Sequence, residues 1–200
     1  MSEIHYPGGV RPVAEFTSKT QPKKKMTMKI SPGNRGMDFE AEINQTNDYY
    51  KEKDLAVFSK RPTPINIVKV DYSRGAKITE AYFETQSTTD YNGVYKGHYV
   101  DFEAKSVHGK TSFPLANIPR QQIEHLKYVL HHGGIGFFLI RFVTKEETFL
   151  VPASYVIDFY EKRERASIPL EDIRANGYLI PVGYRPRYDF LPLIDEAFLK

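Results

Sequence analysis

Apolar and polar residues alternate most strictly between positions 99 and 105, and this alternation predicts a β-strand. Val100, Phe102 and Ala104 fall on one face of such a strand. The opposite face carries the polar row Tyr99, Asp101, Glu103 and Lys105. Because a strand with one apolar face buries that face, the charged row is expected to line a cleft or to meet water.

A tight turn is expected just before this strand. Lys96-Gly97 suits a two-residue hairpin turn, since glycine tolerates positive φ. Folding back at this turn brings Asp90, on the preceding strand, towards Glu103. Two carboxylates and the ammonium group of Lys105 then converge.

This convergence suits a metal-dependent phosphodiesterase. Mg²⁺ takes oxygen ligands and keeps several waters, so one or two carboxylates suffice to hold it. A lysine on the same face can hold the attacking water or offset charge that grows on the phosphorus centre. A generic Glu-x-Lys pair is more often a solvated surface row. The upstream Asp90 and the hairpin register favour a site.

Other periodic segments predict a mixed α/β domain. A helix that Asn117 and Pro119 open and Gly133-Gly134 closes places Gln122 at the edge of its buried stripe, where its amide oxygen could face a metal or a water. In a helix at 37–50, Glu40 borders the apolar stripe and faces either a site or solvent. Further strands are expected at 65–70, 135–142 and 147–151, short helices at 155–160 and 191–199, and a projecting hairpin arm at 71–87.

Charge is unevenly distributed along the 200 residues. The net charge is +3, but residues 1–35 carry seven Lys or Arg and two Glu, so this segment is at +5 and the rest at −2. We interpret residues 1–33 as a flexible basic tail that can neutralise phosphates, and residues 34–200 as the folded domain. A merely solubilising extension is the alternative for the tail.

Composition excludes several classes of site and location. The chain has no cysteine, so disulfides, thiolate metal sites and a cysteine nucleophile are excluded. Its strongest apolar run, at 135–140, is too short to span a bilayer, and no signal segment opens the chain. The expected location is therefore the cytoplasm, with no membrane partner.

Several strings in this sequence resemble the RecU family of bacterial Holliday junction resolvases, from about residue 31 to the C-terminus. They are GNRGM at 33–37, KRPTP at 60–64, STTDYNGVYKG at 87–97, DFEAK at 101–105, KTSFPL at 110–115 and QIEH at 122–125. The resemblance implies a restriction-endonuclease-like fold of the PD-(D/E)xK class. Such a fold has a central mixed β-sheet flanked by helices, here with a projecting stalk at 71–87.

The resemblance also implies roles for individual residues. Asp90 and Glu103 match the central Mg²⁺ ligands, with Mn²⁺ as a plausible substitute. Thr88 and Gln122 match positions that complete the metal site, and Lys105 matches the residue that stabilises the transition state. Thr89 stands where the class usually has proline. Asp101 shares the face of Glu103 and is interpreted as a structural carboxylate.

The implied activity is resolution of Holliday junctions by a homodimer, through paired symmetric nicks in recombination and DNA repair. The four-way DNA junction is the expected partner, and a role in modulating a recombinase could coexist with catalysis. Two alternatives stay open at this point: a sequence-specific restriction-type endonuclease, and a non-catalytic junction-binding protein. Basic groups such as Lys60, Arg61 and Lys77 are candidates for phosphate contacts.

Overall fold

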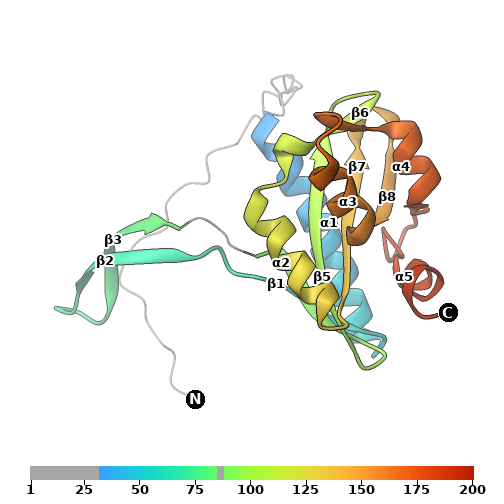
Figure 1. Cartoon of the computed structure of the whole chain (residues 1–200). Coiled ribbons are helices and arrows are strands. Elements are labelled where there is room, and N and C mark those ends of the chain that lie inside the picture. The colour runs from blue at the N-terminus through green and yellow to red at the C-terminus, as the bar shows by residue number, and fades with distance from the viewer. Residues whose placement is uncertain (1–31, 85–87) are drawn as a thin grey trace, which may run out of the picture. The chain divides into compact units, whose positions relative to one another are not determined.

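A six-stranded mixed β-sheet forms the centre of the computed structural model, which describes residues 32–84 and 88–200, with side chains from residue 39 onwards (Figure 1). Its strands, in spatial order, are β1 (Val57–Lys60), β4 (Tyr91–Tyr95), β5 (His98–Val107), β7 (Ile135–Phe142), β8 (Glu147–Pro152) and β10 (Tyr178–Leu179). β5 and β7 run parallel, whereas the other neighbours are antiparallel. The expected central mixed sheet is confirmed. The predicted tail, residues 1–33, lies almost entirely outside the described residues.

Helices cover both faces of this sheet (Figure 1). They are α1 (Pro32–Glu52), α2 (Arg120–His131), α3 (Ala153–Lys162), α4 (Leu170–Asn176) and α5 (Leu191–Phe198). α1 and α5 contribute Phe39, Ile43 and Ile194 to one core cluster, and α2 and α3 contribute Leu126 and Val156 to another. β7 lies between the two clusters, which explains its nearly continuous apolar sequence. No described helix is long and apolar enough to cross a membrane.

Short elements complete the chain between these helices. They are β6 (Ser112–Pro114), which pairs with β9 (Ser167–Pro169), and the 3₁₀ turns η1 (Leu115–Asn117) and η2 (Val143–Lys145). α1 begins earlier than the predicted helix at 37–50. α4 was not predicted, because its seven residues are too few to establish a helical period.

The predicted hairpin is present with the predicted register. Tyr91 pairs with Phe102 and Tyr95 pairs with His98, which leaves Lys96 and Gly97 as a two-residue turn. Both turn residues have positive φ, 48° and 80°, as a turn of this kind requires. This register places the residue before Tyr91, which is Asp90, opposite Glu103.

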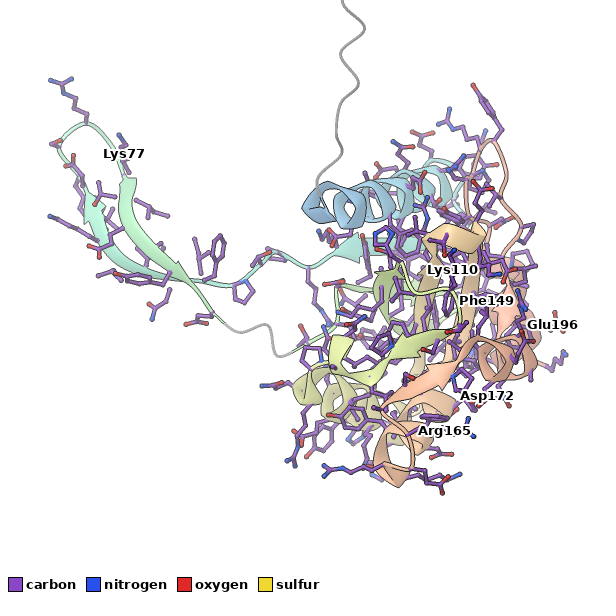
Figure 2. All side chains as sticks on the ribbon, turned by 90° about the horizontal axis from the view of Figure 1, so that it is seen from above. Lys77, Lys110, Phe149, Arg165, Asp172 and Glu196 are labelled. Atoms are coloured by element: carbon purple, nitrogen blue, oxygen red, sulfur yellow. The ribbon has the colours of Figure 1, made fainter. Side chains whose placement is uncertain are left out.

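A separate two-stranded arm is formed by β2 (Ile65–Asp71) and β3 (Lys77–Phe83). Every side chain of β3 is exposed, and every one of β2 except Val70. Figure 2 shows side chains standing out along both strands, with Lys77 towards the far end. The arm therefore begins earlier than the expected 71, because the strand predicted at 65–70 belongs to it. Residues 85–87 of the expected stalk lie outside the described part of the chain.

Candidate metal centre

The three groups expected to converge meet on the hairpin formed by β4 and β5. Glu103 is fully buried, and its Oε2 accepts a 2.8 Å hydrogen bond from the Asp90 backbone N–H. Lys105 Nζ lies 2.6 Å from Glu103 Oε1 as an ion pair. The Lys105 side chain is 21% exposed, so it is partly accessible to solvent. The strand alternation and the turn thus place Asp90, Glu103 and Lys105 together.

The negative charge of Glu103 is only partly compensated by its neighbours. Burial, together with the nearby negative charge of Asp90, raises the pKa of Glu103 to about 7. Lys105 and the Asp90 N–H oppose this shift without cancelling it. A divalent cation beside the two carboxylates would favour their charged forms, so this site fits such an ion.

Gln122 supplies an oxygen on the same side of the sheet. It is 3% exposed, and its Oε1 has no hydrogen-bond partner among the described residues. Glu103 stands beside Phe138 in the register of β5 and β7, and Phe138 belongs to the core cluster under α2. The helix that carries Gln122 therefore covers the face from which Glu103 projects. A buried amide oxygen without a partner has the chemistry of a ligand to a hard cation or to its water.

The placement of Thr88 differs from the expectation. It was expected on the strand face of Asp90, but β4 begins only at Tyr91, and residues 88–90 form a bend before it. Strand alternation therefore does not place the Thr88 side chain, which is partly exposed. Within residues 32–84 and 88–200, no three His, Cys, Asp or Glu side chains gather as a metal-binding group. The oxygen-bearing side chains that the hairpin and α2 offer here are two carboxylates and an amide.

A second buried carboxylate, Asp101, lies two residues before Glu103 on the same strand. Its Oδ2 accepts hydrogen bonds from Arg61 at 2.7 Å and from the Tyr99 hydroxyl at 2.7 Å, and His125 Nε2 lies 3.0 Å away. The Thr89 hydroxyl donates to Oδ1. Burial alone would raise the pKa of Asp101, but these hydrogen bonds and the charge of Arg61 bring that pKa below its usual range. Asp101 is thus a fully partnered structural carboxylate.

Sequence reasoning missed the partners of Asp101. Arg61 was considered only as a phosphate contact, and His125 only as part of a short string. Their signal was weak, because the two residues lie 40 and 24 positions away from Asp101. Glu40 is not simply solvated, since it forms an ion pair with Lys60 at the end of β1.

Comparison with known proteins identifies clear relatives. The family model "RecU: Recombination protein U" matches residues 34–196. A Holliday junction resolvase RecU from Lactococcus lactis subsp. cremoris (strain SK11) is 56% identical over 181 residues, which cover 89% of this chain and 84% of the relative. A Holliday junction resolvase RecU from Geobacillus sp. (strain WCH70) is 46% identical over 205 residues, which cover 98% of this chain and 98% of the relative. Among solved structures, the Archaeoglobus fulgidus Holliday junction resolvase Hjc matches with a TM-score of 0.41 and 11% identity, over 72% of this chain and 94% of that chain.

Proposed function

The chain belongs to the RecU family, and on this basis we propose that it is a divalent-metal-dependent endonuclease that resolves four-way DNA junctions. The relatives that carry the name Holliday junction resolvase cover most of its length. The observation that carries the chemistry is the meeting of Asp90, Glu103 and Lys105 on one hairpin. We propose that each active site cuts one strand, so that two sites make paired symmetric nicks.

We assign metal binding to the carboxylates of Asp90 and Glu103, with Gln122 and Thr88 completing the set. The proposed cofactor is Mg²⁺, for which Mn²⁺ is a plausible substitute, because the donors are all oxygen atoms. A divalent cation supplies Lewis-acid chemistry at a phosphate and makes water nucleophilic at neutral pH. The support is the incompletely compensated charge of Glu103 and the Gln122 oxygen without a partner among the described residues.

We assign stabilisation of the transition state to Lys105. In phosphodiester hydrolysis, the water oxygen bonds to phosphorus, the bond to the leaving oxygen breaks, and negative charge grows on the phosphoryl oxygens. Glu103 holds the Lys105 ammonium group by an ion pair at 2.6 Å, and the lysine is partly exposed. A fixed positive charge at this point can balance the growing charge without rearrangement during the reaction.

We also propose that the protein acts as a homodimer. A four-way junction has approximate two-fold symmetry, and a closed two-fold dimer presents two identical sites to it. An isolated two-stranded hairpin is only marginally stable in water, yet the arm exposes Ile67, Val68 and Phe83. A second copy of the chain would cover these side chains. Modulation of a recombinase and a cytoplasmic location stay predictions.

A synthetic mobile four-way junction and a matched linear duplex, incubated with Mg²⁺ or with EDTA, test this function. The expected result is paired symmetric nicks confined to the junction and dependent on Mg²⁺. Glu103→Gln is expected to bind the junction without cutting it. Glu171→Gln, at an exposed glutamate of α4, is the matched control and should cut normally.

Two other outcomes would contradict the proposal and point to its alternatives. Cutting of the linear duplex at a defined sequence would indicate a restriction-type enzyme. Junction binding that is equal in EDTA and Mg²⁺, with no cut strand, would indicate a non-catalytic binding protein.

A further inference from the structure

The chain segments on both sides of the arm meet at the metal centre. Arg61 lies four residues before β2 begins, and Asp90 follows β3 after a short connection. The two segments are joined directly, because the Arg61 backbone N–H donates a 2.7 Å hydrogen bond to the Asp90 carbonyl oxygen. Residues 88–90 form a bend rather than a strand, so contacts outside the sheet ladder hold this segment.

The Arg61 side chain holds the same segment a second time. Its Nη1 lies 3.3 Å from the Thr89 carbonyl oxygen and 3.0 Å from the Thr89 hydroxyl. Its Nη2 donates to Asp101 at 2.7 Å and to the Tyr99 hydroxyl at 2.8 Å. Arg61 therefore holds the peptides on both sides of Asp90, the one after it through its backbone N–H and the one before it through its guanidinium group.

Asp101 fixes the guanidinium group of Arg61 in place. Its side chain is fully buried, whereas that of Arg61 is 19% exposed. His125, on α2, lies 3.0 Å from Asp101 and so connects the cluster to the helix that carries Gln122. The planar fork of a guanidinium group can serve several acceptors at fixed angles, which the single ammonium group of a lysine cannot do.

We propose that Arg61, anchored by Asp101, is a positioning residue for the metal centre. By fixing Thr89 and the Asp90 backbone, it orients the Asp90 carboxylate towards Glu103. It also ties the base of the arm to the metal centre. This inference rests on the proposed function, since it concerns the metal-binding role of Asp90.

Arg61→Lys tests the inference, because it keeps the charge and removes the fork. Partners behind metal ligands typically contribute about 10- to 100-fold to metal affinity or activity. We therefore expect Mn²⁺ binding, measured by calorimetry without DNA, to weaken about 10-fold or more. Single-turnover junction cleavage should slow by a similar factor and need more Mg²⁺ for half of its maximal rate. Junction affinity in EDTA should stay unchanged.

Arg141→Lys is the matched control. Arg141 is 22% exposed and bonds Glu42 at 2.8 Å, and its strand neighbours Ile140 and Phe142 lie in the core cluster that also holds Phe138, so Arg141 projects from the other face of the sheet. This variant should keep the wild-type Mn²⁺ affinity and cleavage rate, and both variants should unfold at similar temperatures. Asp101→Asn should reproduce the Mn²⁺ defect, because it weakens the anchor of Arg61.

Three results distinguish failure of the inference from failure of the function. If Arg61→Lys binds Mn²⁺ and cuts like Arg141→Lys, Arg61 does not position the centre. If it loses junction affinity in EDTA but keeps its Mn²⁺ affinity and its rate at saturating junction, Arg61 is a DNA contact and the inference is wrong. If the wild-type protein binds Mn²⁺ but cuts no junction, the proposed function fails, and the Mn²⁺ affinities still decide the role of Arg61.

Discussion

Two buried carboxylates on one strand have opposite pKa shifts, and their surroundings explain why. Asp101 is surrounded by donors and by the Arg61 guanidinium group, so its pKa is lowered. Glu103 is buried and has a second carboxylate close by, and its one ion-paired lysine does not offset these effects, so its pKa is raised to about 7. The surroundings of Asp101 therefore stabilise its negative charge. Those of Glu103 lack positive charge, which a bound cation can supply.

The first prediction concerns the pH dependence of stability in EDTA. A carboxyl group whose folded-state pKa is raised binds its proton more tightly in the native protein, so it reduces stability as pH rises. For Glu103, stability is lost as the pH rises from its usual pKa of 4.5 to its folded-state pKa of about 7. Between pH 4.5 and pH 8, the free energy of unfolding of the wild-type protein should therefore fall by on the order of 2–3 kcal/mol relative to that of Glu103→Gln.

Chemical denaturation of both proteins over this pH range measures the difference. Adding Mg²⁺ at pH 8 should stabilise the wild-type protein and leave Glu103→Gln nearly unaffected. If the stability of the two proteins in EDTA changes with pH in the same way, the pKa of Glu103 is not raised in the folded protein.

The sequence is sufficient to predict part of the site. Alternation from 99 to 105 and the turn at Gly97 together predict that Asp90, Glu103 and Lys105 converge, because hairpin register is a local property. It does not predict the contacts of Arg61 and His125 with Asp101, which arise only when distant segments pack. The sequence also does not show that the strand starts only at Tyr91, so the role of Thr88 stays a prediction.

At the scale of elements, the close pairing of β1 and β4 depends on a glycine. A Cβ atom on Gly93 would lie 1.9 Å from the Val57 carbonyl oxygen and 2.8 Å from Phe58 Cα. Both are backbone atoms, so no side-chain rotation can relieve the overlap. β1 would have to move away from the sheet that carries the metal centre.

The second prediction follows from this close approach. Gly93→Ala should destabilise the protein by about 2–3 kcal/mol, as overpacking in a core does. Denaturation by urea measures the change. Val94→Thr is the control, because Val94 is on the same strand, is 52% exposed and keeps its branching. Equal stability of the two variants would show that β1 can shift without cost.

Element prediction succeeded where periodicity was long and failed where elements were short. The hairpin, β7 and α2 were found because each has a clear period or a clear stop signal. β10 and α4 were missed because two and seven residues carry too little pattern. The strand at 65–70 was recognised, but alternation cannot show that it belongs to an exposed arm rather than to the central sheet.

At the scale of the whole molecule, the exposed arm predicts association. Ile67 is 48% exposed in β2, and a charge at this position should oppose burial against a second copy. Ile67→Asp should therefore shift the protein from dimer towards monomer in sedimentation velocity at micromolar concentration.

Leu179→Asp is the control for this third prediction. Leu179 is 57% exposed, but it lies in β10 at the edge of the central sheet, away from the arm. This variant should stay dimeric. A monomeric Leu179→Asp together with a dimeric Ile67→Asp would place the interface elsewhere.

The most direct test of the metal centre is the position of Mn²⁺ in a crystal of the protein, located by anomalous scattering. Asp90 and Glu103 are proposed to hold the ion together, with the Gln122 oxygen facing it directly or through water. The expected result is an anomalous peak in direct contact with both carboxylates, which disappears in Glu103→Gln. A peak beside Asp101 instead, or none between Asp90 and Glu103 at saturating Mn²⁺, would contradict the proposed centre.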